Sequence, residues 1–363
     1  MRLGLAVALA AAALVACSRP RPPIADCAPS ANARPICGFH NPEDLALLPN
    51  AKVLVVSEMG ALDGSKPGAL QFLDLATEQK TRAFPPGSDA SAAVAGWGDP
   101  ACTGGPGAAF SPHGLDLARR PDGALELLVV NHGGRESIEL FEVSDAPGAP
   151  ALEWRGCVPA PEDAMLNDVA ALPDGGFVTT WFQSRSHPGR DLVLGLLGFA
   201  TGRVLEWQPG AGWKKVPNSD APTPNGIAVS PDGEKLYVDV YLGDEVRVLA
   251  RRSGEVLGSV EVASPDNLNW TPDGRLLVAS HNAPLNEIAA CAQLESGQCP
   301  FHFAIMLLDP DELQATALYE NAGPPMGAGT SALRVGDELW IGSFAGDRLL
   351  RAKLPDWATK QPG

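Results

Sequence analysis

Basic residues are scarce in this chain of 363 residues. It contains 27 Lys and Arg against 43 Asp and Glu, which gives a formal net charge of −16 at pH 7. Proteins that bind nucleic acids use clustered Lys and Arg to neutralise phosphates. The charge balance therefore argues against a nucleic-acid partner.

Several well-known motifs are also missing. There is no Gly-x-Ser-x-Gly turn, so a serine hydrolase built on a nucleophile elbow is disfavoured. No glycine-rich nucleotide-binding motif follows a strand and opens a helix. No CxxC pair or His-spaced partner supports a zinc site. Beyond the N-terminus, no segment is long and apolar enough to cross a membrane.

The N-terminus is typical of an exported protein. Arg2 is followed by an apolar run over residues 3–16, which is short for a membrane span and fits a secretory signal. The run ends in the letters LVAC, which resemble a bacterial lipobox with its cysteine at Cys17. We expect cleavage before Cys17 and lipid attachment to its sulfur. The alternative is an ordinary signal peptide that is cut a few residues later.

These features predict three regions in the chain. Residues 1–16 form the lipoprotein signal peptide, residues 17–36 are a Pro-, Ala- and Ser-rich lipidated tether, and residues 37–363 form the folded domain. We expect an exported bacterial lipoprotein anchored to a membrane by its N-terminal lipid. Ser18 at the second mature position favours the outer membrane if the organism is Gram-negative.

Six cysteines remain after Cys17, an even number that predicts disulfides in an exported chain. Six cysteines allow fifteen connectivities. Sequence proximity favours the first two and the last two as partners, which leaves the middle two for each other. The expected bridges are Cys27–Cys37, Cys102–Cys157 and Cys291–Cys299.

A short segment repeats six times along the chain. Each copy has a polar residue, an alternating apolar run, a turn that resembles Pro-Asp-Gly, and a second apolar run. In one copy, residues 225–230 alternate with the period of a strand, residues 231–233 read Pro-Asp-Gly, and residues 235–240 form the returning strand. The copies begin at Glu43, His113, Asn167, Asn225, Asp266 and Gly329.

Six hairpin repeats predict an all-β fold, a single six-bladed β-propeller with a central calcium-binding channel. The 39 Gly and 34 Pro residues suit such a turn-rich protein. The innermost strands of a propeller surround its channel, so the residues that open the repeats should converge there. Seven residues at the first two positions of the repeats are Glu, Asp or Asn, whose side-chain oxygens are the ligands that calcium prefers: Glu43, Asp44, Asn167, Asp168, Asn225, Asp266 and Asn267. Singly, each could instead cap a turn.

The order and spacing of eight short segments resemble the paraoxonase/arylesterase family of calcium-dependent six-bladed propeller lactonases, over about residues 41–354. Gluconolactonase-like and strictosidine-synthase-like propellers share the architecture but match these segments less well. The segments are Pro42-Glu43-Asp44, Lys66-Pro67-Gly68, Ser111-Pro112-His113-Gly114, Val129-Val130-Asn131-His132, Leu166-Asn167-Asp168-Val169, Pro224-Asn225-Gly226-Ile227, Asp266-Asn267-Leu268 and Ser280-His281-Asn282.

The resemblance implies two calcium ions. The structural ion would be held by Asp44, Asp168 and the backbone carbonyl of Leu115. The catalytic ion would be held by Glu43, Asn167, Asn225, Asp266 and Asn267.

The resemblance also implies that His113 and His132 form a pair that activates and orients water, with His281 at the mouth of the site. A neutral imidazole is a suitable general base near pH 7. Either histidine of the pair could instead bind a buried backbone carbonyl.

Two features depart from the family pattern. Gly133-Gly134-Arg135 stands where the family usually has proline, which is a departure at one wall of the pocket. No cysteine follows Cys299, so the family's disulfide between the two ends of the propeller cannot form. Strand pairing or local bridges must close the ring. The Gly- and Ala-rich stretch 88–107 is expected to shape the entrance.

We therefore expect a monomeric, calcium-dependent hydrolase of small lactones or activated aryl esters. Calcium would polarise the carbonyl group, and the histidine pair would activate water. One alternative is a cell-surface binding propeller that does not catalyse and whose calcium is structural. Another is a sugar lactonase of the gluconolactonase type.

Overall fold

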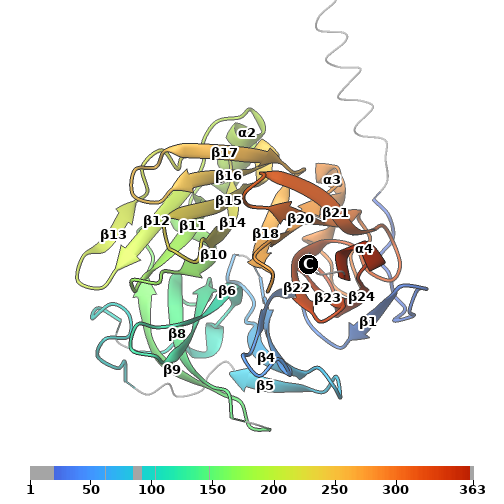
Figure 1. The fold of residues 1–363 in the computed structure, drawn as a ribbon, viewed down its shortest axis with the longest axis horizontal. Coiled ribbons are helices and arrows are strands. Elements are labelled where there is room, and N and C mark those ends of the chain that lie inside the picture. The colour runs from blue at the N-terminus through green and yellow to red at the C-terminus, as the bar shows by residue number, and fades with distance from the viewer. Residues whose placement is uncertain (1–19, 62, 85–91, 103, 147, 360–363) are drawn as a thin grey trace, which may run out of the picture.

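A computed structural model describes residues 20–61, 63–84, 92–102, 104–146 and 148–359. Six antiparallel four-stranded sheets surround a central axis (Figure 1). The predicted six-bladed propeller is thereby confirmed. The predicted signal peptide and the lipid site at Cys17 lie outside the described residues.

Each sheet is one blade, and the blades are numbered here in chain order. Within blades 1–5 the strands follow one another from the axis outward, and the first strands of successive blades contact each other in a ring. Blades 1–3 contain β2 (Pro42–Leu47), β3 (Val53–Glu58), β4 (Ala69–Asp74), β5 (Lys80–Phe84); β6 (Pro112–Arg119), β7 (Leu125–Asn131), β8 (Ser137–Ser144), β9 (Ala151–Pro159); β10 (Ala164–Ala171), β11 (Phe177–Ser184), β12 (Arg203–Gln208) and β13 (Gly212–Lys215).

The remaining blades use the second half of the chain and one strand from its beginning. Blades 4–6 contain β14 (Pro224–Val229), β15 (Lys235–Val240), β16 (Glu245–Ala250), β17 (Val256–Glu261); β18 (Pro265–Trp270), β19 (Leu276–His281), β20 (Phe303–Asp309), β21 (Gln314–Asn321); β22 (Gly329–Val335), β23 (Glu338–Ser343), β24 (Arg348–Lys353) and β1 (Ala33–Cys37).

Helices are short and lie in the connections. None of those in the described part of the chain is long and apolar enough to cross a membrane. They are the 3-10 turns η1 (Gly107–Ala109) and η2 (Tyr241–Gly243) and the α-helices α2 (Pro188–Leu196), α3 (Leu285–Cys291) and α4 (Asp356–Thr359).

The Pro-Asp-Gly turns form the hairpins that the sequence predicts. Between β14 and β15, Gly233 adopts φ +77° and its N–H donates to the carbonyl of Ser230 at 2.8 Å. The carboxylate of Asp232 accepts the N–H of Glu234 at 3.1 Å. Glycine tolerates this positive φ because it lacks a Cβ atom, and aspartate commonly bonds the backbone two residues ahead.

Strand pairing between the two ends of the chain closes the ring. β1 pairs antiparallel with β24 and completes blade 6, with Ala33 opposite Ala352 and Cys37 opposite Arg348. β1 therefore begins inside the segment 17–36 that was expected to be a tether. Ile24 also forms an isolated β-bridge with Gln298, which lies in the connection before β20 of blade 5. Part of the segment 17–36 therefore packs on the propeller.

All three expected disulfides are present. Their Cα atoms are 6.4 Å apart in Cys27–Cys37, 5.5 Å in Cys102–Cys157 and 5.5 Å in Cys291–Cys299. The middle bridge links Cys102, in the segment before β6, with Cys157 in β9, the outermost strand of the same blade.

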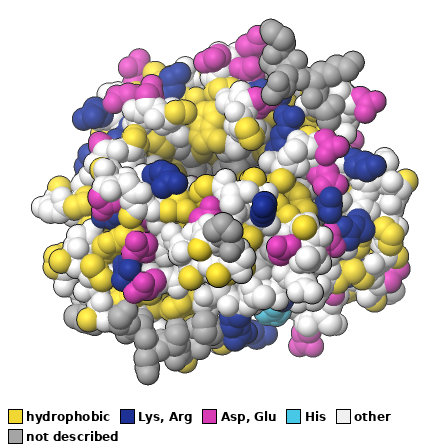
Figure 2. Space-filling model, turned by 60° about the horizontal axis from the view of Figure 1, so that its bottom comes forward, with side chains coloured by type: hydrophobic (Ala, Val, Ile, Leu, Met, Phe, Trp, Pro, Cys, Tyr) yellow, Lys and Arg dark blue, Asp and Glu magenta, His cyan; other side chains and the backbone are white. Residues whose placement is uncertain are grey.

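The apolar core lies between neighbouring blades, while the axis is polar. Between blades 1 and 2, for example, Val55, Phe72, Leu127, Phe141 and Trp154 pack into one buried cluster. On the outside, acidic and basic side chains are interspersed with small apolar patches over the face shown in Figure 2. Burial of apolar side chains thus holds the blades together, and this leaves the channel available for polar residues.

Candidate active site

A register irregularity marks the start of the innermost strand in every blade. In each hairpin, the pairing of the first strand with the second shifts in the first half of the first strand. Such bulges bend a strand and re-aim its side chains. The shifts fall between Pro42 and Asp44, Pro112 and Leu115, Leu166 and Val169, Pro224 and Ile227, Pro265 and Leu268, and Gly329 and Ala332.

The bulges bring together predicted site residues from four blades. The side-chain N–H of Asn267 in blade 5 donates to Glu43 Oε1 in blade 1 at 2.6 Å. Nε2 of His113 in blade 2 lies 3.6 Å from the same oxygen. In blades 4 and 5, the side chain of Asn225 is hydrogen-bonded to the carboxyl of Asp266. Residues more than 220 positions apart thus share one buried site.

Four oxygens of the predicted catalytic calcium ligands are buried and have no hydrogen-bond partner: Glu43 Oε2, Asn167 Oδ1, Asn225 Oδ1 and Asn267 Oδ1. An unpaired buried polar group costs about 1–3 kcal/mol, so four of them at the starts of the innermost strands call for a ligand. All four are oxygens, which suits a hard cation. We call them, together with Asp266, the oxygen ring.

Asparagine supplies much of the oxygen ring. Three of its five residues are asparagines, which offer neutral amide oxygens. No group of three or more His, Cys, Asp or Glu side chains in the described ranges is arranged to hold a metal ion. The residues present therefore fit a cation that accepts amide oxygens, such as calcium, better than one that requires histidine or cysteine.

Asp44 and Asp168 lie beside the ring and connect neighbouring blades. Asp44 accepts the N–H of Leu45 at 2.8 Å and that of Leu115 in blade 2 at 2.9 Å. Asp168 likewise accepts the N–H of Val169 and that of Ile227 in blade 4, both at 2.8 Å. The carbonyl of Leu115 was the predicted calcium ligand; in the structure, the backbone N–H of Leu115 donates a hydrogen bond to Asp44.

A cavity of about 320 Å³ lies in the channel next to Asp44, Asp168 and Asn267. It extends along the innermost strands towards their C-terminal ends, as far as Trp270 and Leu333. The two aspartates and Asn267 of the oxygen ring therefore line this hollow part of the channel.

Burial raises the pKa of the carboxyl groups at the axis. The pKa of Glu43 lies well above its usual value because of burial and then the neighbouring carboxyls of Asp44, Asp266 and Asp168. Burial also raises the pKa of Asp266 to about 8 and that of Asp44 to about 6. A cation at this place would favour the ionised carboxylates and lower these pKa values again.

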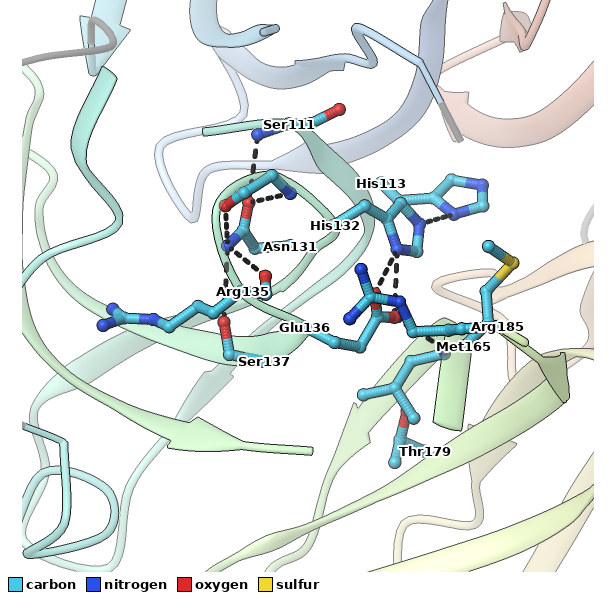
Figure 3. Close-up of polar contacts among 12 residues, drawn as sticks. Ser111, His113, Asn131, His132, Arg135, Glu136, Ser137, Met165, Thr179 and Arg185 are labelled. Carbon is cyan, nitrogen blue, oxygen red and sulfur yellow. Dashed lines mark hydrogen bonds and ion pairs between the residues drawn. The ribbon is translucent and has the colours of Figure 1, made fainter. Parts of the chain in front are cut away.

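His113 and His132 are in direct contact (Figure 3). His113 lies in β6, His132 follows β7, and Nδ1 of His113 is 2.9 Å from Nε2 of His132. Nδ1 of His132 faces both carboxylate oxygens of Glu136 at 3.0 and 3.1 Å. Burial, followed by the charge of His132, lowers the pKa of His113 well below its usual value. His113 is therefore neutral at pH 7 and has a lone pair available for a proton.

His281, at the end of β19, lies against the oxygen ring. Its Nε2 is 3.0 Å from the carbonyl of Gly329 and 3.3 Å from Asp266 Oδ2. Burial lowers the pKa of His281 to about 4, against the opposing hydrogen bond to Gly329. The neutral ring donates from Nε2 to that carbonyl, so Nδ1 accepts the hydroxyl of Tyr241 at 3.0 Å.

Comparison with known proteins agrees with this geometry. The arylesterase family model matches residues 37–351, most of the chain. This protein belongs to the arylesterase family. Serum paraoxonase/arylesterase 2 of Homo sapiens is 26% identical over 236 residues, which cover 62% of this chain and 60% of the human protein. The same protein of Rattus norvegicus is 26% identical over 262 residues, covering 69% of each chain.

Solved structures share the fold of this arylesterase-family protein. A gluconolactonase from Xanthomonas campestris aligns with a TM-score of 0.50 and 18% identity, covering 93% of this chain and 99% of that one. A luciferin-regenerating enzyme aligns with a TM-score of 0.50 and 14% identity, covering 87% and 92%. At these identities the likeness establishes the architecture alone.

Two further residues of this arylesterase-family site come from blade 6. The hydroxyls of Thr330 and Ser331 donate to the backbone carbonyl of Glu43 at 2.7 and 3.0 Å. They tie the last blade to the first at the level of the oxygen ring. The sixth repeat begins at Gly329, so their position in the repeat was a signal that could have identified them.

Asp239 is another residue that the repeat pattern does not reveal. It lies in β15, is 0% exposed, and neither carboxylate oxygen has a hydrogen-bond partner. Burial, followed by the charges of Asp266 and Asp168, raises its pKa well above the usual value. The available signal was a single acid inside an otherwise apolar returning strand.

Proposed function

We propose that this protein is a calcium-dependent hydrolase of small lactones and activated aryl esters. One observation carries the proposal: a ring of unpartnered, buried oxygens beside a buried histidine pair. Membership of the arylesterase family supports ester or lactone hydrolysis as the reaction class. The histidines supply a base at the point where the oxygen ring could hold the substrate carbonyl through a cation.

Glu43, Asp266 and the three asparagines of the ring would hold the catalytic calcium. Bound there, calcium would polarise the substrate carbonyl and stabilise the negative charge that develops on its oxygen. The two carboxylates supply the charge that neutralises the ion, and the amide oxygens complete a set of hard ligands.

His113 is the proposed general base. Its Nε2 accepts a proton from a water molecule, and the water oxygen bonds to the carbonyl carbon. The C–O bond to the alkoxide or phenoxide then breaks, and the leaving oxygen takes up the proton. His132 accepts a hydrogen bond from Nδ1–H of His113 and so stabilises the imidazolium that forms. Burial of the pair keeps His113 neutral and competent at pH 7.

We place a second, structural calcium at Asp44 and Asp168. Both carboxyl groups are buried, and their hydrogen bonds run to backbone N–H groups rather than to Lys or Arg side chains. The carbonyl of Leu115 is the proposed third ligand. Asp44 already connects blade 1 to blade 2, and Asp168 connects blade 3 to blade 4, so an ion between them would stabilise the closed ring.

A substrate panel with calcium removed and restored tests the proposed function. We expect turnover of an aliphatic lactone and an aryl ester, complete loss with a chelator, and recovery when calcium is added. Turnover that persists after chelation would contradict the calcium chemistry. No turnover, together with a calcium-dependent melting temperature, would instead identify a binding propeller. A strong preference for polar sugar lactones would favour a sugar lactonase.

We further propose that the protein is an exported lipoprotein with lipid on Cys17, on the basis of the lipobox alone. Cys17→Ala should prevent lipid attachment, because only the cysteine sulfur can form the thioether. The variant should appear in the soluble fraction or remain as the larger, unprocessed precursor. Unchanged size and unchanged membrane association on fractionation and immunoblotting would refute this placement.

A further inference from the structure

The carboxylate of Glu136 is the partner of the histidine pair on the side away from the oxygen ring (Figure 3). Glu136 directly precedes β8 and is 7% exposed. Oε1 accepts the backbone N–H of Leu166 at 2.7 Å, and both oxygens lie within 3.1 Å of His132 Nδ1. The guanidinium of Arg185 approaches from the solvent side, with Nε 3.9 Å from Oε2.

These contacts fix the protons on both histidines. An ionised carboxylate only accepts hydrogen bonds, so Nδ1 of His132 must carry the hydrogen that faces Glu136. With its hydrogen on Nδ1, the His132 ring has its lone pair on Nε2, which accepts from Nδ1 of His113 at 2.9 Å. His113 in turn has its lone pair on Nε2, the atom 3.6 Å from Glu43 Oε1. The proposed base therefore points its free lone pair at the oxygen ring.

The loop does not need Glu136 to hold its shape. Asn131 organises the turn between β7 and β8: its Oδ1 accepts the N–H groups of Ser111 and Gly133, both at 3.0 Å. Its Nδ2 donates to the carbonyls of Gly133 and Arg135 at 3.0 Å and to the hydroxyl of Ser137 at 3.3 Å. Asn131 thus accounts for the turn, and the main side-chain partner of Glu136 is a histidine.

The glycines before Glu136 explain how the turn can be so tight. A Cβ atom on Gly133 would lie 1.6 Å from the carbonyl oxygen of Ala109, and Gly134 has φ +75°. Neither position accommodates an ordinary side chain. The departure noted in Gly133-Gly134 therefore lets the chain turn back and place Glu136 under His132.

We propose that Glu136 is a positioning residue, which holds a hydrogen on His132 Nδ1 and thereby leaves His113 Nε2 unprotonated towards the oxygen ring. This inference rests on the proposed hydrolase function. The carboxylate acts through two imidazoles and touches neither substrate nor the reacting atoms. Partners of this kind set which nitrogen of a histidine carries its hydrogen.

The tautomers can be measured directly by NMR of the full chain labelled with ¹⁵N at histidine. In the wild type we expect the Nδ1–H form for His113 and His132. His281 provides an internal reference of the opposite kind, because its Nε2–H donates to Gly329. If His113 and His132 both showed Nε2–H in the wild type, the inference would be overturned without any variant.

Glu136→Gln tests the same point by substitution. Glutamine can keep an oxygen for Leu166, but its NH₂ group then replaces Oε2 next to His132 Nδ1. Of the two acceptors that face His132 Nδ1, one is then replaced by a donor that repels its hydrogen, and the remaining oxygen is shared with Leu166. This favours the form of His132 with its hydrogen on Nε2, which also moves the hydrogen of His113 to its Nε2. We expect both tautomers to change and lactone kcat to fall by about 10²–10⁴-fold, as for loss of a general base, with little change in KM.

Glu139→Gln is the matched structural control. Glu139 is also buried, lies three residues further along, and binds Arg135, Ser137 and Trp154 without touching a histidine. Its loss should lower stability and leave both tautomers unchanged. Glu136→Asp, which remains an acceptor only, should retain the Nδ1–H forms and recover part of kcat.

Two results would overturn the inference: unchanged tautomers in Glu136→Gln, or changed tautomers with undiminished turnover. Failure of the proposed function would look different, because the wild type would then hydrolyse neither lactone nor ester. In that case the NMR result still decides whether Glu136 orders the histidine pair.

Discussion

Glu43→Gln is expected to abolish hydrolysis of every substrate and to weaken calcium binding severely. Glutamine preserves the shape of Glu43 and an oxygen for the hydrogen bond from Asn267, but it removes the negative charge at the centre of the oxygen ring. Loss of an outer-shell partner already weakens metal binding by about 10–100-fold, so loss of a direct ligand should exceed this. Calorimetry with calcium and lactone turnover on the same preparation measure both effects.

Glu126→Gln is the control for removing a buried glutamate. Glu126 lies in β7, away from the axis, and pairs with Arg120. Its replacement should leave calcium affinity and turnover near the wild-type values. If Glu43→Gln kept wild-type turnover, the enzyme hypothesis itself would fail.

Asp168→Asn should distinguish the proposed structural calcium site from the proposed catalytic site. The variant leaves either Val169 N–H or Ile227 N–H without its acceptor, which should lower the free energy of unfolding by about 1–3 kcal/mol. It also weakens the proposed structural site. Its melting temperature should therefore be lower and should gain less from calcium, because an ion bound only to the folded state stabilises that state. Calcium titration would show two sites in the wild type and one in this variant.

The second large effect concerns the base. His113→Gln is expected to reduce lactone turnover by about 10²–10⁴-fold while calcium affinity and melting temperature stay close to the wild type. The base has no other role in this proposal, since its Nδ1 bonds only to His132 and its Nε2 faces the site. Aryl esters have better leaving groups and should depend on the base less.

His302→Gln is the matched control, because His302 is half-buried outside the site and pairs with Glu320. It should leave turnover unchanged. If His113→Gln and His132→Gln both retained full lactone turnover while Glu43→Gln abolished it, the cation alone would carry the chemistry. The role assigned to the histidine pair would then be wrong.

The regular part of this molecule could be read from the sequence. The Pro-Asp-Gly turns are local, so one copy such as 225–240 already predicts a hairpin, and six copies predict the ring. The disulfides followed from proximity along the chain and by elimination. The convergence of Glu43, His113 and Asp266 followed from their equivalent places in the repeat, because blades related by rotation present equivalent residues to one axis.

Features that break the repeat could not be predicted in this way. Glu136 lies in a loop, where no periodicity indicates the direction of a side chain. Asp239 lies in a strand whose other residues read as ordinary core, and only the packing of blade 4 shows that it is fully buried. The bulges depend on pairing between strands, which one strand's sequence does not specify.

The pairing of β1 with β24 makes the two ends of the chain members of one blade. The strand that is synthesised first has no partner until the strand that is synthesised last is available, some 300 residues later. Blades 1–5 can form in order from local hairpins, whereas the ring as a whole must wait for the complete chain. A break near either terminus should therefore open the same blade, and a fragment that lacks its final strand should remain an open arc however many intact blades it contains.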